Sequence, residues 1–303
     1  METFNKKVTI VLPVYNGEKF VSKAINSIIN QTYSNWELII VNDCSTDNSL
    51  AICKEYEKKD DRIRLYSNKV NLKLPKSLNV GFSHAKGDYY TWTSDDNIMR
   101  ENALEVMTKA LENSNEVDMV YSDYWNIDAM GKKISICRLQ QPNKIVESNV
   151  CGPCFLYKAS IAKIIGEYDE NLFLAEDYEY WMRIYIYGKM LHIDNILYYY
   201  RRHDMSLTSK KKDTINYQTY KALEKNFMQL YIAAKSNRLE FGFFDQIVNR
   251  ANNRVKNIKD KLILIDRRYY WYLFMKDVKN RISSTCFLKR IRQIKNRLFE
   301  SII

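Results

Sequence analysis

The sequence has 303 residues, of which 46% are apolar and 27% charged, with only 8 Gly and 4 Pro. This composition excludes a disulfide-stapled miniprotein, a collagen-like chain and a low-complexity linker, and it allows one large domain with an appendage or two smaller domains. The formal charge of +11 by itself would suggest a nucleic-acid or anionic membrane partner for the whole chain. The charge is unevenly distributed, however, because residues 1–209 carry 25 basic and 28 acidic side chains whereas residues 250–303 carry 15 and 4.

Strands and helices are expected to alternate through the first 124 residues. Aliphatic and β-branched runs predict strands, the first of them stopping at Pro13, and apolar residues at helical spacing predict the helices between them. The predicted strands are Val8–Leu12, Trp36–Val41, Ile63–Tyr66, Tyr89–Thr93 and Asp118–Tyr124, and the predicted helices are Lys19–Ile29, one that opens at Ser45, Leu74–Ala85 and Glu101–Asn113. Such alternation indicates βαβ units, so the expected fold class is α/β with a mostly parallel central sheet.

The next segment is less regular. A hairpin is expected to turn at Met130-Gly131, and a helix over Asp177–Tyr187 is expected to end at Gly188. After Lys210-Lys-Lys212 the pattern is helical without strands. We therefore predict an α/β domain over residues 1–210 and a helical, basic C-terminal region over residues 211–303.

Polar clusters directly follow three of the predicted strands, at Pro13–Gly17, Asn42–Asp47 and Ser94–Asn97. Each alone could be an ordinary turn or helix cap, but ligands of open α/β sheets bind outside the carboxyl ends of the strands. Asp95 and Asp96 are the most informative pair, because adjacent carboxylates repel one another unless a cation compensates. Mg²⁺ and Mn²⁺ bind carboxylates together with substrate phosphates, which indicates a nucleotide diphosphate as the ligand.

In their order and spacing, these motifs resemble the family 2 glycosyltransferases of GT-A fold. The resemblance rests on Val8–Asn16, Val41–Asp47, Thr91–Asn97, Gly152–Tyr157, Gly166–Asp169, Glu176-Asp177 and Tyr200–His203. It covers about residues 6–210 and implies a Rossmann-like nucleotide-sugar transferase domain that works with inversion in bacterial polysaccharide assembly.

The resemblance also implies which residues bind the donor. The residues expected to contact the nucleotide sugar are Pro13, Val14, Tyr15, Asp43, Asn71 and Asp95. Asp96 is expected to hold a divalent cation, Mn²⁺ or Mg²⁺. The family often has a further Asp where this chain has Thr93, and a cationic residue of the family is missing, for which Lys76 is expected to substitute.

The catalytic residues follow from the same resemblance. Asp177 is expected to be the general base that deprotonates the acceptor hydroxyl, with Glu176 and Trp181 orienting acceptor or donor. Near the end of the domain, Arg202 is expected to pair with the diphosphate and His203 to reach the metal or a phosphate.

Two other features have structural interpretations. Cys151-Gly-Pro-Cys154 has the spacing of a thioredoxin-type redox site, but a strand-like Phe-Leu-Tyr run follows it, so a redox role is not expected. The family resemblance implies that this stretch lines the acceptor side of the cleft. His84 and His192 are expected to be packed or surface residues and not ligands.

The C-terminal segment from Phe287 to Ile302 predicts a basic amphipathic helix, which is typical of binding to an anionic membrane surface. Tyr269–Tyr272 adds aromatics suited to an interface. The alternative is that this helix packs on the transferase domain or on a second subunit of a homo-oligomer. No nucleic acid is expected as a partner, since no recognised binding module accompanies the charge.

The expected location is the cytoplasm, at most peripherally on the inner face of the plasma membrane. The six Cys lack a regular spacing, no apolar N-terminal segment precedes them, and the longest apolar run, Tyr269–Met275, is too short to span a bilayer.

Together these features predict an inverting transferase that moves a sugar from a nucleotide diphosphate, UDP above others, to a hydroxyl of a glycan or lipid-linked acceptor. Two alternatives stay open: transfer to a polyprenyl phosphate, and a nucleotide-sugar-binding protein without turnover.

Overall fold

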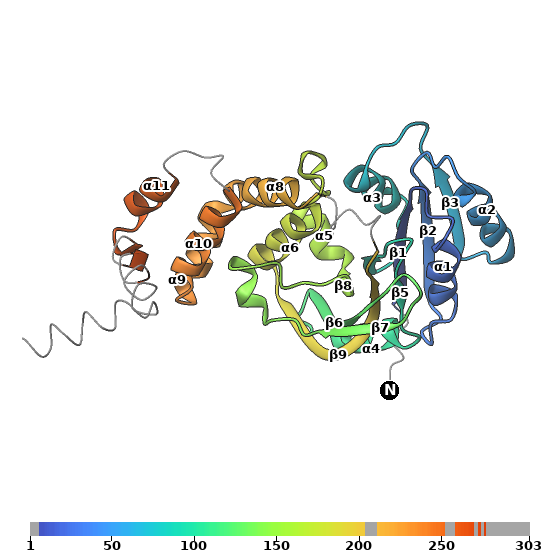
Figure 1. The fold of residues 1–303 in the computed structure, drawn as a ribbon. Helices are drawn as coiled ribbons and strands as arrows, with labels where there is room; N and C mark the ends of the chain where they lie inside the picture. Colours follow the sequence, from blue (N-terminus) through green and yellow to red (C-terminus); the bar gives the residue numbers. More distant parts are fainter. Residues whose placement is uncertain (1–5, 204–210, 252–257, 270–271, 274–275, 277–303) are drawn as a thin grey trace, which may run out of the picture. The chain divides into compact units, whose positions relative to one another are not determined.

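The structure is a computed structural model that describes residues 6–203, 211–251, 258–269, 272–273 and 276 (Figure 1). It forms two compact units, one up to Arg250 and one from Ala251 onward. The predicted domain boundary at residue 210 lies outside the described residues, as does the predicted helix over Phe287–Ile302.

The first unit begins with the expected alternation of strands and helices. Its elements are β1 (Val8–Val14), α1 (Val21–Ile29), β2 (Trp36–Asn42), α2 (Ser49–Lys59), β3 (Ile63–Ser67), α3 (Leu74–Ser83), β4 (Tyr89–Trp92), β5 (Ile98–Met99), α4 (Ala103–Glu112) and β6 (Met119–Ile127). The chain continues through β7 (Lys133–Cys137), the 3₁₀ helix η1 (Pro142–Val146), β8 (Phe155–Lys158), α5 (Ala159–Ile165), the 3₁₀ helix η2 (Glu170–Leu172), α6 (Glu176–Tyr187) and β9 (Met190–Arg201). The predicted hairpin is confirmed, with Gly131 at φ +92° in the turn between β6 and β7.

These strands form one mixed sheet in the order β3-β2-β1-β4-β8-β6-β9-β5. β7 lies outside this order and pairs with β6. β3, β2, β1 and β4 are parallel, β8 is antiparallel to both β4 and β6, and β9 is parallel to β6. The carboxyl ends of β1, β2, β4, β6 and β9 therefore meet at one edge of the sheet, together with the beginning of β8. The α/β fold class with a largely parallel sheet is confirmed.

The centre of the sheet is covered on both faces. β1 and β2 are almost wholly buried, which is typical of central parallel strands that read as continuous apolar runs. One core cluster joins their side chains to the apolar stripes of α1 and α4, including Ile25, Ile28, Leu104 and Met107. The sheet is thus a rigid platform for the loops at its carboxyl edge.

The structure changes the interpretation of Pro13. β1 does not stop there but continues to Val14, with Pro13 paired to Val41. The carbonyl of Val11 accepts from Thr93 N, so alternate residues of β1 face β4, and the β1–β4 ladder ends at Val11. Pro13 faces the β4 side beyond that end, where its missing N–H removes no ladder hydrogen bond.

Gly188 ends α6 as predicted, but its backbone is extended, at φ −147°, and does not adopt the left-handed conformation common at helix ends. A Cβ at this position would lie 2.8 Å from Asp118 Oδ2. Close approach of the Asp118 side chain, and not backbone conformation, therefore accounts for this glycine.

The helices expected after residue 210 are confirmed for the described residues: α8 (Lys212–Lys225), α9 (Phe227–Ser236), α10 (Glu240–Ala251) and α11 (Ile258–Ile265). Tyr269, expected at an interface, is instead fully buried. Within the described part of the chain, no helix combines the length and the apolar character needed to cross a membrane.

Candidate active site

Asp96 and His203 meet at the carboxyl edge of the sheet. Asp96 follows β4 and His203 follows β9, and although 107 positions separate them, His203 Nε2 lies 2.9 Å from Asp96 Oδ2. The other carboxylate oxygen of Asp96, Oδ1, is buried and has no hydrogen-bond partner in the structure. A buried carboxylate oxygen without a donor is costly, so this atom is an open coordination or hydrogen-bonding position.

Arg201 holds these two residues in place. Its Nε donates to the carbonyl of Asp96 at 2.8 Å, and its backbone N–H donates to Asn97 Oδ1 at 2.8 Å. Its guanidinium also lies 4.6 Å from the centre of the Phe20 ring, and the residue is 1% exposed. No role was predicted for Arg201 from the sequence. Its position was informative nevertheless, because an Arg that is buried at the end of a strand needs several hydrogen-bond acceptors.

Asp95 lies against the loop after β1. The backbone N–H of Tyr15 donates to Asp95 Oδ2 at 3.3 Å, and a Cβ on Gly17 would come within 2.2 Å of the same oxygen. Burial, and next the charge of Asp96, raise the pKa of Asp95 to about 7. Tyr15 itself is 51% exposed at this edge, where a flat ligand can stack on it.

Asp43, predicted to bind the nucleotide, is occupied by the protein's own loop. Its Oδ1 accepts from Asn68 Nδ2 and from the backbone N–H of Leu72, and its Oδ2 accepts from the backbone N–H of Lys73. These bonds stabilise residue Lys73 at φ +72° just before α3. Asp43 therefore shapes this loop, on the side that is predicted to bind the nucleotide sugar.

Two other residues that are predicted to bind the nucleotide sugar lie in that loop and on α3, which follows it. Asn71, in the loop held by Asp43, has a buried Oδ1 without a partner, as expected of a ligand-binding amide. Lys76 on α3 forms an ion pair with Glu170 at 3.1 Å, so its charge is already balanced within the protein. Pro13 and Val14 belong to β1, and the Val14 side chain is buried at 1% exposure.

Glu176 and Asp177 open α6 as neighbouring carboxyl groups. Glu176 is 4% exposed and its Oε2 accepts from Leu174 N at 2.6 Å. Burial, and next the charge of Asp177, raise the pKa of Glu176 to about 8. Burial also raises the pKa of Asp177, while hydrogen bonds from Tyr178 N and Asn149 Nδ2 oppose the increase. Because two adjacent carboxylates resist double ionisation, the pKa of about 8 for Glu176 favours a pair that keeps one proton, on Glu176, near neutral pH.

The segment before β8 brings Asp177 to the same edge as Asp96. β8 runs antiparallel to β4, with Tyr157 opposite Tyr90, so the residues that precede β8 lie beside the end of β4. In this segment Asn149 bonds both Cys151 N, at 3.2 Å, and Asp177 Oδ2, at 3.5 Å.

The two cysteines of this segment are free and buried. Burial raises the pKa of Cys154 to about 12 and that of Cys151 well above its usual value. Buried, protonated thiols are poor nucleophiles, which agrees with the expectation that the Cys-Gly-Pro-Cys motif is not a redox site. As also expected, His84 stacks on Tyr66, and His192 pairs with the buried Asp123 at 2.8 Å.

Trp181 differs from the role predicted for it, whereas Arg202 remains available for its predicted role. Trp181 is 1% exposed and packs against Phe155 with ring centres 4.4 Å apart, so it stabilises the core and has no surface to offer a sugar. Arg202 is exposed; its Nε donates to Asn126 Oδ1 and its guanidinium lies over the Tyr200 ring. An anion at the sheet edge can still reach the exposed guanidinium.

The residues at this edge fit a divalent cation shared with a substrate. Asp96 Oδ1 is an orphaned hard oxygen, and His203 adds a nitrogen donor beside it. Within the described residues no group of three or more His, Cys, Asp or Glu side chains could hold a metal by itself. Two protein donors completed by phosphate oxygens and water are the usual arrangement for Mg²⁺.

Thr93, at the position where the family often has another carboxylate, cannot contribute a ligand. It is 2% exposed, and its Oγ1 lies 2.5 Å from the hydroxyl of Tyr198. The side chain faces the core, where it is engaged by the Tyr198 hydroxyl.

The sequence is similar to that of known proteins. Residues 9–166 match the family model described as Glycosyl transferase family 2. An uncharacterized glycosyltransferase of Rickettsia typhi is 27% identical over 282 residues, covering 88% of this chain and 87% of that protein. The minor teichoic acid biosynthesis protein GgaB of Bacillus subtilis is 27% identical over the whole of this chain, which spans only 33% of GgaB.

Two solved structures share the fold. Residues 1–349 of S. aureus TarS in complex with UDP-GlcNAc align with a TM-score of 0.65 and 19% identity, covering 87% of this chain and 78% of that one. The mannosyltransferase PcManGT of Pyrobaculum calidifontis, in complex with GDP-Man and Mn²⁺, aligns with a TM-score of 0.60 and 14% identity, covering 93% and 89%. Since the family model matches more than half of the 303 residues, the chain belongs to glycosyltransferase family 2 and is a glycosyltransferase.

Proposed function

We propose that the protein transfers a sugar from a nucleotide diphosphate, UDP above others, to an acceptor hydroxyl with inversion at the anomeric carbon. The observation that carries this proposal is that two groups of side chains, each with a carboxylate, lie at the carboxyl edge of one sheet. One is Asp96 with His203 and an orphaned oxygen, and the other is Asp177 beside a protonated Glu176.

The donor side is formed by the loops after β1, β2, β3 and β4. Tyr15 offers an exposed ring and Asn71 an unpartnered amide oxygen to the nucleoside, and Asp43 fixes the loop that carries Asn71. Asp95 lies beside Tyr15 N, where a ribose hydroxyl can displace the weak 3.3 Å contact. TarS and PcManGT, which share this fold, were solved with a UDP-sugar and a GDP-sugar respectively.

The diphosphate is proposed to lie against Asp96, His203 and Arg202. A Mn²⁺ or Mg²⁺ ion held by Asp96 and His203 would supply positive charge to the leaving diphosphate. Arg201 fixes the turn after β4 through its bonds to the Asp96 carbonyl and the Asn97 side chain, so the site is preorganised before the donor arrives. Arg202 contributes N–H groups to phosphate oxygens from the same strand end.

Asp177 is proposed as the general base. As the acceptor oxygen attacks the anomeric carbon, its proton passes to Asp177, the new glycosidic bond forms, and the bond from the anomeric carbon to the diphosphate breaks. One displacement from the face opposite the leaving group inverts the configuration. Burial raises the pKa of Asp177, which makes it a stronger base, and Glu176 retains its own proton and can donate a hydrogen bond to a sugar hydroxyl.

The acceptor is proposed to be a glycan or lipid-linked intermediate of a cell-surface polysaccharide. This proposal is supported by the relative GgaB, which is named for minor teichoic acid biosynthesis. The basic segment from residue 250 onward, with 15 basic and 4 acidic side chains, would place the enzyme at an anionic membrane surface. Sedimentation with anionic liposomes, compared for the full chain and a chain ending at Ile282, tests the part of this membrane contact that lies beyond Ile282: equal sedimentation of both would remove that part.

A thermal-shift panel of UDP-, GDP- and dTDP-sugars, with and without Mn²⁺, tests the donor proposal. A ligand at one hundred times its Kd stabilises the folded state by about 2.7 kcal/mol. We expect a UDP-sugar to raise the melting temperature most, and more with Mn²⁺ than without. If no nucleotide sugar shifts the melting temperature, the proposal is wrong.

A further inference from the structure

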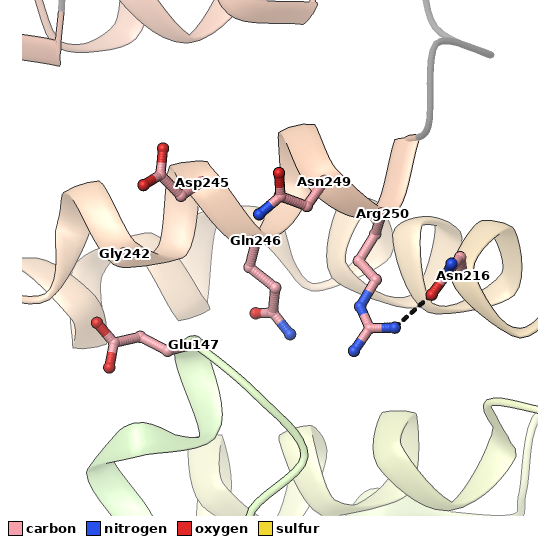
Figure 2. A pocket seen from close by; sticks show the side chains of 7 residues that line it. All are labelled: Glu147, Asn216, Gly242, Asp245, Gln246, Asn249 and Arg250. Carbon is pink, nitrogen blue, oxygen red and sulfur yellow. Dashed lines mark hydrogen bonds between the residues drawn. The ribbon is translucent and has the colours of Figure 1, made fainter. Parts of the chain in front are cut away.

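A cavity of about 420 Å³ lies in the first unit apart from the Asp96 centre (Figure 2). Asp245, Gln246, Asn249 and Arg250 of α10 line it together with Gly242, Asn216 of α8 and Glu147 after η1. Its volume is in the range of small-molecule pockets, roughly 300–1,000 Å³. Every side chain of the lining is polar.

Gln246 lines this cavity and has an unsatisfied acceptor. The residue is 6% exposed, and its Oε1 is buried and has no hydrogen-bond partner. Figure 2 shows its side chain leaving α10 between Glu147 and Arg250. A buried amide oxygen that lacks a hydrogen-bond donor is a position where a ligand or a water molecule can supply one.

The charges around the cavity balance. Two carboxylates, Glu147 and Asp245, are matched by the guanidinium of Arg250 and by Lys144, whose Nζ lies 2.7 Å from Glu147 Oε2. Among the residues that the structure describes around the cavity, these charges leave no net charge. Carboxylate, amide and guanidinium groups together supply both donors and acceptors, which suits hydroxyl groups, since each hydroxyl donates and accepts at once.

Hydrogen bonds connect the cavity to α6, the helix that carries Asp177. Gln246 Nε2 donates to the hydroxyl of Tyr178 at 2.8 Å, and that hydroxyl donates to the carbonyl of Ile145 at 2.5 Å. The backbone N–H of Tyr178 in turn bonds Asp177 Oδ1 at 2.7 Å. The segment that contributes Glu147 also contributes Asn149, which contacts Asp177. Both walls of the cavity thus touch residues that hold the proposed base.

We propose that this cavity is an acceptor subsite that binds a neutral sugar unit of the growing glycan through Gln246, Arg250 and Glu147. The inference rests on the proposed function for its link to transfer, but the binding of a neutral sugar here can be observed independently. Occupancy would be linked to Asp177 through the bonds that join Gln246 to Tyr178 and Tyr178 to Asp177.

Gly242 provides a selective way to fill the cavity. A Cβ at this position would lie 2.0 Å from Glu147 Oε1, the movable end of a side chain, so Gly242→Leu pushes a side chain into the space. Replacing a glycine inside a helix also raises helix propensity, which favours retention of α10. Arg250→Ala is a second variant that empties one wall without adding volume. Gln229→Leu, at an exposed position of α9, is the matched control.

The experiment is saturation-transfer NMR on the full chain with methyl glycosides of glucose, galactose, mannose and N-acetylglucosamine, recorded with excess UDP to fill the donor site. We expect at least one glycoside to bind the wild type and the Gln229→Leu control, and to bind Gly242→Leu and Arg250→Ala about tenfold more weakly or not at all. Glycerol 3-phosphate serves as the anionic comparison.

Three results would overturn the inference: no signal with any glycoside, equal signals in the wild type and both cavity variants, or a signal with glycerol 3-phosphate alone. UDP binding, measured by calorimetry on the same samples, separates this failure from failure of the proposed function. A wild type that binds UDP but no glycoside refutes the subsite only, whereas a wild type that does not bind UDP refutes the donor proposal.

Discussion

Glu176→Gln tests the idea that the two carboxyl groups at the start of α6 share one negative charge. Burial, and next the charge of Asp177, raise the pKa of Glu176 from 4.5 to about 8. Between these values the folded protein holds a proton that the unfolded chain releases. The free energy of unfolding therefore falls as pH rises, by about 1.4 kcal/mol per pH unit, and this loss is absent below the unfolded pKa.

At pH 7 the difference from the unfolded pKa of 4.5 corresponds to a loss of about 3 kcal/mol. Glutamine is neutral at every pH, is close in shape, and retains an oxygen to accept from Leu174 N. We therefore expect Glu176→Gln to raise the free energy of unfolding by about 3 kcal/mol at pH 7 and by less than about 1 kcal/mol near pH 4.5. The corresponding rise in melting temperature at pH 7 is about 6–12 °C.

Urea denaturation of the wild type and the variant at several pH values between about 4.5 and 8 measures this difference directly. Glu55→Gln is the matched control, because the Glu55 side chain is 60% exposed and its ion pair with Lys58 should contribute less than about 1 kcal/mol. If the difference between Glu176→Gln and wild type does not change with pH, or if the variant is less stable at pH 7, Glu176 is not the protonated member of the pair.

Three further substitutions test the site. Asp177→Asn should lower kcat by about 10²–10⁴-fold while calorimetry shows unchanged UDP binding; a variant that retains its kcat excludes Asp177 as the base. His203→Ala should weaken the Mn²⁺-dependent part of UDP binding about tenfold or more, since one donor beside Asp96 is lost; Mn²⁺ titrations that coincide with those of the wild type would contradict the proposed cation site. Gly17→Ala places a Cβ 2.2 Å from Asp95 Oδ2 and should weaken donor binding without lowering the melting temperature by more than a few degrees; unaltered donor binding would remove Asp95 from the donor site.

The first half of the fold was predictable because its periodicities are local. The strands from β1 to β4 and the β6–β7 hairpin occur within a few residues of their predicted positions, since buried parallel strands appear as continuous apolar runs. β9 was not predicted: its pairing with β6 shifts register twice, so its burial does not alternate cleanly. β5 has only two residues, Ile98 and Met99, and is a strand because it pairs with β9.

The candidate site was predictable at the level of strand ends but not of contacts. Asp95 and Asp96 were identified from their position after a predicted strand and His203 from the family resemblance, whereas the bond between Asp96 and His203 depends on where β9 inserts in the sheet. Trp181 was misjudged, because an aromatic residue one turn after a catalytic carboxylate can face either the cleft or the core. Only the packing against Phe155 shows that it faces the core.

Asp43 shows the same limit. A carboxylate after a parallel strand is placed to meet a ligand, and the sequence alone does not reveal that the loop around Asn71 returns to occupy it. Contacts of this kind depend on segments that are distant in the sequence, which a local pattern does not show.

The central claim is that the sheet edge holding Asp96, His203 and Asp177 transfers a sugar from a nucleotide diphosphate. The most direct test is ³¹P NMR of the purified full chain with UDP-, GDP- and dTDP-sugars and Mn²⁺, following release of the free nucleotide for the wild type and Asp177→Asn. The account predicts that the wild type releases UDP from a UDP-sugar and that Asp177→Asn does so at least about 10²-fold more slowly. Release of no nucleotide by the wild type in the presence of cell-wall glycan acceptors, or equal release by both proteins, would contradict it.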